Sequence, residues 1–139
     1  MRNVIVVDTN VVAYLLIEGE HTQAARTVFQ RDPVWAAPLF WRSELRNVLA
    51  RYVRQRHLPL SDALVMQQTA EELFAGSEYP VDSTQVLQAA ATSGCTAYDC
   101  EFVMLAQTLG VSLVTSNQQV LLAFPNVAVA PNAFANGKR

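Results

Sequence analysis

The strongest constraint on the fold is the run Val4–Val7, four consecutive β-branched residues near the start of the chain. A run of this length and composition is typical of a buried strand in a parallel sheet. The surrounding stretch, NVIVVDTNVVAYLLI, contains eleven aliphatic, alanine or tyrosine residues among its fifteen, with Asp8 in the middle. Because a lone carboxylate is costly to bury, we expect Asp8 to lie at the end of the strand rather than inside it.

Strand-like and helical segments alternate along the rest of the chain, which predicts an α/β fold with a small, mainly parallel sheet flanked by helices. Ser61 is predicted to cap one helix, and Gly76, Gly94 and Gly110 are predicted to end helices. The expected strands are Val4–Val7, Val34–Ala37, Val111–Val114 and Val127–Val129. The expected helices are Thr9–Leu16, His21–Gln30, Leu39 to about Arg56, Asp62–Phe74, a helix capped by Asp82 or Ser83 that runs to about Thr92, Tyr98–Leu109 and Gln118–Phe124.

Length and composition predict a single domain over residues 1–139, with a frayed tail from about residue 131. The apolar fraction of 51% fits either a large core or a patch reserved for a partner. No apolar run reaches the roughly 20 residues of a membrane span, and no signal peptide is recognisable, so we expect a cytoplasmic protein with no membrane contact. Cys95 and Cys100 alone build neither a disulfide framework nor a zinc site.

Two of the predicted strands end in polar triplets. Asp8-Thr9-Asn10 follows the first strand, and Thr115-Ser116-Asn117 follows Leu113–Val114. In parallel sheets the reactive groups gather at the carboxyl ends of strands, near a switch in strand order. The two triplets therefore predict a shared crevice, although helix capping by Asp8 and turn chemistry at Asn117 explain the same residues.

Two further acidic residues lie in predicted helices, one beside an apolar stripe and one near a helix start. Glu44 borders the apolar stripe formed by Leu45 and Val48, but by itself it could be a simple boundary residue. Asp99 lies near the start of a helix that Thr96 is expected to cap, and acids are favoured in first turns by the helix dipole alone. Neither acid singly predicts a functional site.

Taken together, the segments VVDTN, RSEL, TAYDCEF and LVTSN, in this order in a chain of this length, resemble a PIN-domain nuclease, and within that family the VapC toxins of toxin–antitoxin pairs. The resemblance extends from Val4 to about Phe124. It implies a three-layer sandwich fold, metal-dependent ribonuclease activity and silencing by a cognate antitoxin. Asp8, Glu44 and Asp99 match the three acidic motifs and are the catalytic residues that the resemblance implies.

The fourth motif differs from the family pattern. The family has Thr-x-Asp, whereas here Thr115 and Ser116 precede Asn117. The resemblance implies that Asp8 and Asp99 bind Mg²⁺ or Mn²⁺, with Glu44 binding directly or through water. Asn117 would supply a neutral oxygen or a hydrogen bond, and Asn10 and Thr115 would orient the carboxylates.

Two residues leave their interpretation open. Asn10 fits two explanations equally well: it could orient the carboxylates, or it could simply favour the start of the first helix. Glu101 lies two residues after Asp99, about 200° around the helix, so the two carboxylates are not expected to converge.

Contacts with RNA must come from a local patch, because the net charge is −2. Half of the ten Lys and Arg residues lie in one predicted helix: Arg42, Arg46, Arg51, Arg54 and Arg56. Arg42 and Arg46 are nearest to Glu44 and are the candidates for binding phosphate, although a solvated helix face explains them equally well. His21 and His57 are expected at the surface, and Trp35 and Trp41 in the core or an interface. Besides RNA, the expected partners are a small antitoxin and a second copy of the chain.

Two rival functions remain. An aspartyl phosphotransferase would place a nucleophilic Asp after the first strand, but that class needs Asp-x-Asp, and position 10 is Asn. The second rival is a weakened or inactive PIN-like module that mainly binds an antitoxin, which the substitution at Asn117 would fit. Cleavage of RNA that depends on metal and on Asp8 separates these possibilities.

Overall fold

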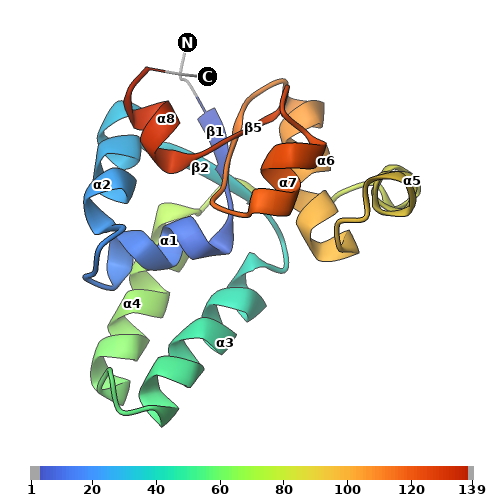
Figure 1. Ribbon diagram of the computed structural model, residues 1–139. Helices are drawn as coiled ribbons and strands as arrows, with labels where there is room; N and C mark the ends of the chain where they lie inside the picture. The colour runs from blue at the N-terminus through green and yellow to red at the C-terminus, as the bar shows by residue number, and fades with distance from the viewer. Residues whose placement is uncertain (1–3, 138–139) are drawn as a thin grey trace.

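The computed structural model describes residues 4–137 and contains one five-stranded sheet (Figure 1). The strands lie in the order β3-β2-β1-β4-β5, and every neighbouring pair is parallel. The α/β class and the parallel sheet are therefore confirmed. The strands are β1 Val4–Val7, β2 Val34–Pro38, β3 Glu78–Tyr79, β4 Leu113–Val114 and β5 Ala128–Val129.

Eight helices surround the sheet in the described part of the chain. Helices α2 and α8 cover one side, α6 packs against β1, β2 and β4 on the other, and α3 and α4 form a pair that projects away from the sheet (Figure 1). The helices are α1 Thr9–Leu16, α2 Thr22–Arg31, α3 Trp41–Arg54, α4 Leu60–Leu73, α5 Ser83–Ser93, α6 Ala97–Leu109, α7 Gln118–Ala123 and α8 Pro131–Ala135. The capping predictions at Thr96, Gly94 and Gly110 are confirmed.

The predicted boundaries of α3 and α4 were wrong by a few residues. Ser61 does not cap α4, because the helix already begins at Leu60, where the Pro59 carbonyl accepts hydrogen bonds from Asp62 and Ala63. At the start of α3, the Leu39 N–H donates to the Tyr79 carbonyl and continues the pairing of β2 with β3. Tertiary pairing thus overrides the helical pattern there.

The segment expected to fray contains α8. Phe134 is fully buried, and the Arg31 guanidinium of α2 donates to the Phe134 carbonyl at 2.6 Å while lying 5.1 Å from the centre of its ring. This contact joins residues 103 positions apart, which is why the sequence around Phe134 did not predict it. The expectation of a frayed end at Lys138 and Arg139 falls outside the described residues.

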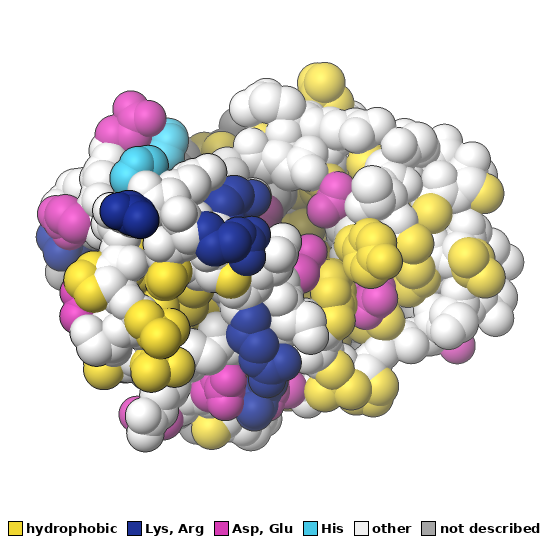
Figure 2. Space-filling model, turned by 90° about the horizontal axis from the view of Figure 1, so that it is seen from below, with side chains coloured by type: hydrophobic (Ala, Val, Ile, Leu, Met, Phe, Trp, Pro, Cys, Tyr) yellow, Lys and Arg dark blue, Asp and Glu magenta, His cyan; other side chains and the backbone are white. Residues whose placement is uncertain are grey.

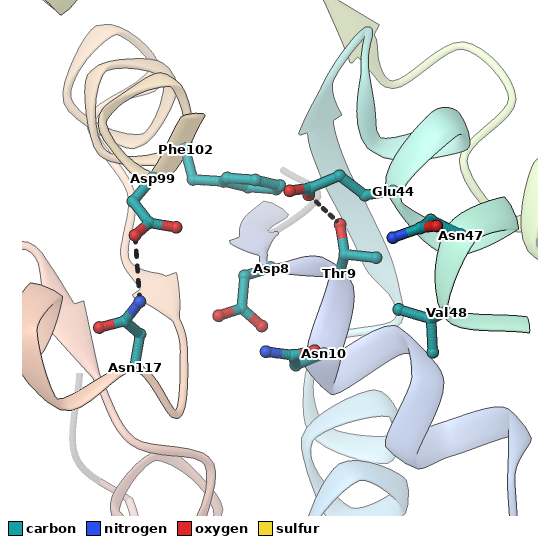
Figure 3. Close-up of a pocket in the computed structure, with 9 residues that line it drawn as sticks. All are labelled: Asp8, Thr9, Asn10, Glu44, Asn47, Val48, Asp99, Phe102 and Asn117. Carbon is teal, nitrogen blue, oxygen red and sulfur yellow. Dashed lines mark hydrogen bonds between the residues drawn. The ribbon is translucent and has the colours of Figure 1, made fainter. Parts of the chain in front are cut away.

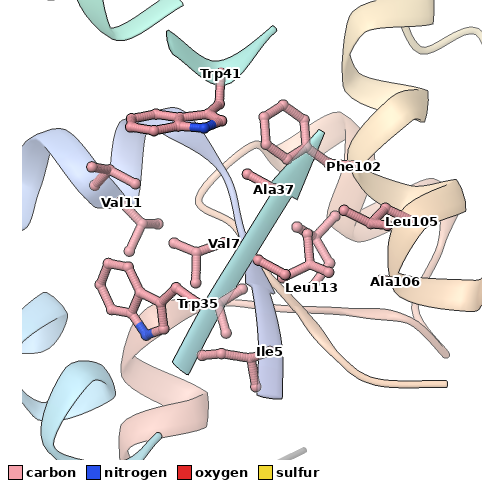
Figure 4. Packing of buried hydrophobic residues seen from close by; sticks show 14 of the residues in the cluster. Ile5, Val7, Val11, Trp35, Ala37, Trp41, Phe102, Leu105, Ala106 and Leu113 are labelled. Carbon is pink, nitrogen blue, oxygen red and sulfur yellow. The ribbon is translucent and has the colours of Figure 1, made fainter. Parts of the chain in front are cut away.

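The core lies on both sides of the central strands (Figure 4). Trp35 and Trp41 are fully buried, as predicted, and each packs near Phe74, with the Trp41 and Phe74 ring centres 4.4 Å apart. His21 and His57 are exposed, also as predicted. None of the helices described here is long and apolar enough to cross a membrane.

The strand order creates a switch point beside β1. The chain moves from β1 to β2 on one side and later returns to β4 on the other, so β1 and β4 are neighbours whose connections diverge. Val7 pairs with Val114, which places Asp8 next to Thr115 at the carboxyl ends of both strands. In open α/β sheets this is where ligands bind. The strand order and register therefore place the two polar triplets side by side at one edge of the sheet, as predicted.

Candidate active site at the carboxyl end of the sheet

A pocket of about 150 Å³ opens at this switch point (Figure 3). Four separate elements bring its acidic and amide side chains together. Asp8 precedes α1, Glu44 lies in the first turn of α3, Asp99 in the first turn of α6, and Asn117 precedes α7. The residues that line the pocket are Asp8, Thr9, Asn10, Glu44, Asn47, Val48, Asp99, Phe102 and Asn117.

Asp8 is both the cap of α1 and a member of the pocket. Its Oδ1 accepts a hydrogen bond from the Val11 N–H at 3.1 Å, and its Oδ2 accepts one from the Thr115 hydroxyl. Burial raises the pKa of Asp8 to about 6, and the negative charges of Asp99 and Glu44 add to the rise, while the two hydrogen bonds oppose it. Thr115 thus orients Asp8.

Glu44 is held at the side of the pocket opposite Asp99 (Figure 3). The hydroxyl of the buried residue Thr9 donates to Glu44 Oε1 at 2.7 Å. Burial raises the pKa of Glu44, and the charges of Asp99 and Glu101 add to the rise. Glu101 does not line the pocket, so it contributes charge nearby without joining Asp99 there.

Asn117 orients Asp99 and turns its own oxygen away from the pocket acids. Its Nδ2 donates to Asp99 Oδ2 at 3.1 Å, while its Oδ1 accepts from the Val120 N–H at 3.1 Å and caps α7. Because the Val120 N–H requires an acceptor, this capping bond fixes which way the amide faces. Asn117 therefore presents a donor to Asp99, and its oxygen is engaged at the helix rather than offered as a ligand.

The neighbouring residues divide into those that hold a carboxylate and those that only line the pocket. Asn10 is exposed at the rim, and within residues 4–137 its side chain makes no hydrogen bond to a carboxylate. The sequence placed Thr9 in the polar triplet at the crevice but gave it no role, and it did not predict Asn47, Val48 or Phe102 as pocket residues. Asn47 and Val48 follow Glu44 by three and four positions, so helix periodicity could have found them. The bond between Thr9 and Glu44 has no such local signal.

Arg42, predicted above to contact phosphate, is instead engaged by carboxylates of its own chain. Its Nε and Nη2 donate to the two oxygens of Glu78 at 2.7 and 2.8 Å, and its Nη1 donates to Glu71 at 3.0 Å. The Arg42 guanidinium holds the pKa of Glu78 below its usual range. The Arg46 side chain is more exposed than that of Arg42, and its Nη2 lies 4.0 Å from Glu71 Oε2, farther than the 3.0 Å between Arg42 and Glu71. In Figure 2, basic side chains border the hollow between the two halves of the molecule, near visible acidic side chains.

The donor chemistry of the pocket fits a hard divalent cation. Asp8 and Asp99 supply carboxylate oxygens, and burial raises the pKa of Asp8, with the charges of Asp99 and Glu44 adding to the rise. Among residues 4–137, however, no three His, Cys, Asp or Glu side chains are placed to hold one metal ion between them. A cation bound at Asp8 and Asp99 would therefore complete its coordination with water, as Mg²⁺ commonly does.

Fold and site together define the class of protein: a parallel α/β sheet with an acidic pocket at its switch point. The sequence profile of the PIN domain matches residues 5–128, and the chain belongs to the PIN domain family, whose members are generally nucleases. A search of curated protein sequences finds no match.

Three solved structures have the same fold. PAE2754 from Pyrobaculum aerophilum superposes with a TM-score of 0.78 at 18% identity, over 98% of this chain and 96% of that one. FitAcB from Neisseria gonorrhoeae has a TM-score of 0.69 at 20% identity, over 91% and 97%. A toxin–antitoxin complex from Klebsiella pneumoniae has a TM-score of 0.64 at 15% identity, over 91% and 97%.

Proposed function

We propose that this chain is a metal-dependent endoribonuclease, the VapC-type toxin of a toxin–antitoxin pair, that hydrolyses phosphodiester bonds of RNA in the cytoplasm. The observation that carries the proposal is the meeting of Asp8, Glu44 and Asp99 in one pocket although they come from three separate elements. Membership of the PIN domain family and the likeness to a toxin–antitoxin complex support it.

The pocket residues have distinct roles in this proposal. Asp8 and Asp99 hold a Mg²⁺ or Mn²⁺ ion, with Thr115 and Asn117 keeping their carboxylates in position. When bound, the ion supplies Lewis acidity toward the scissile phosphate and lowers the pKa of a coordinated water. Glu44, held by Thr9, accepts a proton or positions water at the opposite side of the pocket.

Cleavage of RNA by the purified protein tests the proposal directly. We expect cleavage with Mn²⁺ or Mg²⁺, none with EDTA, and loss of activity in Asp8→Asn. Asp82→Asn is the matched control, because Asp82 also caps a helix with its side chain but lies exposed outside the pocket. Equal cleavage by both variants would contradict the assignment of the site.

A weakened module that mainly binds an antitoxin is the second candidate, and Asn117 favours it. In place of the family's acidic side chain, the chain has an amide whose oxygen caps α7. A folded wild-type protein that does not cleave RNA with either metal, but co-purifies with a small antitoxin encoded beside it, would select this candidate.

A further inference from the structure

A second cavity adjoins the acidic pocket and has no role in the proposed chemistry. It measures about 410 Å³ and shares Asn10 and Val48 with the pocket, so the two spaces are adjacent along α1 and α3. Its other walls include Tyr14, His21, Arg51 and Tyr52. We call it the flanking cavity.

Aromatic rings make up part of the flanking cavity. Tyr14 and His21 lie with their ring centres 4.5 Å apart, and the Tyr14 hydroxyl is held by a hydrogen bond with Ser116 at 3.2 Å. The His21 side chain is 56% exposed, which leaves ring surface available to a ligand. Tyr52 lines the cavity from α3. Such rings are what unstacked bases of single-stranded RNA stack on.

The positively charged side chain of Arg51 also lines the flanking cavity. Arg51 follows Glu44 by seven positions on α3, two helical turns along the same face. Among the described residues no carboxylate forms an ion pair with Arg51, in contrast to Arg42. Of the acids that line the cavity, Glu18 pairs with Arg26 at 2.9 Å, and Glu20 has a side chain that is 87% exposed. Arg51 is therefore available for an external anion.

We propose that the flanking cavity binds the nucleotide next to the cleaved bond of a single-stranded RNA, with its base against the aromatic rings and its phosphate on Arg51. This inference rests on the proposed ribonuclease function. The mixture of rings and a free cation favours a nucleotide over a protein segment. The groove between α3 and α4, by contrast, is lined almost entirely by apolar surface, the composition of a protein contact.

Binding of a short fluorescein-labelled single-stranded RNA tests the proposal without catalysis. In an Asp8→Asn background, which prevents cleavage, Arg51→Gln is compared with Arg54→Gln. Both variants remove one positive charge from the same helix, but Arg54 lines the α3–α4 groove instead. We expect Arg51→Gln to weaken RNA binding about 10-fold and to reduce the slope of log K against log salt by about 0.7. Arg54→Gln should change neither.

The role of the aromatic rings is tested by titrating the protein with adenosine monophosphate. Binding is monitored through the NMR signals of the ring protons of Tyr14, His21 and Tyr52. These signals should shift on titration in the wild type and shift less in Arg51→Gln. The unperturbed signals of the variant also verify that it is folded. Equal RNA affinities for the two arginine variants, or ring signals that do not move, would overturn the proposal and leave the cavity to a protein partner.

The two hypotheses fail in different ways. If the wild type cleaves RNA with metal but Arg51→Gln binds RNA as tightly as Arg54→Gln does, the proposed nucleotide binding by the flanking cavity is wrong and the proposed ribonuclease activity is supported. If the wild type never cleaves RNA, yet Arg51→Gln selectively weakens RNA binding, the proposed activity is wrong and the chain is an RNA-binding module.

Discussion

At the scale of single residues, the site depends on hydrogen bonds that hold negative charges close together. Asp8 accepts bonds from Thr115 and the Val11 N–H, and Asp99 accepts one from Asn117. These donors compensate only part of the charge, because burial and the neighbouring acids still raise the pKa of Asp8 to about 6. The metal-free protein therefore carries a destabilising carboxylate where a cation would be stabilised.

The first prediction concerns Asp8 and pH. The pKa of Asp8 in the folded protein exceeds its ordinary value of 3.8, so the folded state binds this proton more tightly than the unfolded state. The resulting stability is fully present below about pH 4 and is lost as the pH rises through about 6. In EDTA at neutral pH, Asp8→Asn should therefore raise the free energy of unfolding by about 1–3 kcal/mol. Urea unfolding at pH 5 and pH 8 measures this.

Asn still caps helices, so Asp8→Asn keeps the bond to the Val11 N–H. The variant should also show a smaller decline in stability between pH 5 and pH 8 than the wild type, with a residual decline from Glu44, whose pKa is raised by burial as well. Asp82→Asn, at the exposed cap of α5, should leave that decline in place. A large loss of stability in metal-free Asp8→Asn would mean that the carboxylate is mainly structural.

The second prediction concerns Asn117. Asn117→Asp keeps an oxygen for the Val120 N–H but replaces the donor to Asp99 with a second negative charge. We expect metal-free stability to fall by about 1–2 kcal/mol, because Asp99 loses a hydrogen bond and gains a repulsive neighbour. Mn²⁺ should bind more tightly by about 1–3 kcal/mol, since the new charge adjoins the cation.

Calorimetric titration with Mn²⁺ and urea unfolding in EDTA decide the outcome. Asn117→Ser, which also caps helices but adds no charge, separates the lost bond from the added repulsion. The wild type should bind one ion well. Equal affinity and stoichiometry in the wild type and Asn117→Asp would place residue 117 outside the metal site.

At the scale of elements, the short helices and strands are stabilised by contacts with distant residues, which their own sequences do not predict. Helix α8 has five residues, too few to be stable alone, and depends on burying Phe134 against α2. Similarly, the carboxylate of Glu78 in β3 accepts hydrogen bonds from Trp41 Nε1 at 2.6 Å and from the guanidinium of Arg42. This network joins the start of α3, which carries Glu44, to the edge of the sheet.

The third prediction tests α8. Phe134→Ala should lower the free energy of unfolding by about 3–5 kcal/mol, because it removes a fully buried ring. Asn132→Ala, on the exposed side of the same helix, should change it by less than about 0.5 kcal/mol. Urea unfolding of both variants gives the comparison. Similar small effects would mean that the segment frays in solution, as its sequence suggested.

At the scale of the whole molecule, the exposed apolar side chains are unevenly distributed. Helix α4 alone carries Leu60, Leu64 and Val65, each about 61–63% exposed, beside the apolar groove that it forms with α3. Such a concentration marks a contact surface more often than chance exposure does. This surface lies on the α3–α4 pair, which projects from the sheet (Figure 1).

The fourth prediction is that the chain is a homodimer through this surface. Light scattering at micromolar concentration, in the absence of antitoxin, should give the mass of two copies. Leu64→Glu should shift the protein to the monomer, because it introduces a charge into the apolar contact. Leu122→Glu is the control, since Leu122 is 81% exposed on α7, away from α4. A wild-type monomer, or dissociation in both variants, would count against this interface.

The sequence by itself determined four of the five strands, most of the helices and the family, but it did not predict β3 Glu78–Tyr79. These follow from local signals: Val4–Val7 has the composition of a buried strand, the Thr96 hydroxyl can accept a hydrogen bond at a helix start, and Gly94 and Gly110 adopt the left-handed conformation of helix ends because they lack a Cβ. The gathering of Asp8, Glu44 and Asp99 in one pocket could also be anticipated, because parallel strands share a carboxyl edge and the acidic motifs match the family.

Only the tertiary structure decided which groups those acids contact and what surrounds them. The bond from Thr9 to Glu44 spans 35 positions, that from Thr115 to Asp8 spans 107, and the Arg31 contact that anchors α8 spans 103. The partners of Arg42 and the orientation of the Asn117 amide are decided in the same way, by elements distant in sequence or by a competing helix N–H. Local composition sets backbone preference, whereas hydrogen-bond partners and burial depend on packing between segments that the sequence order does not place side by side.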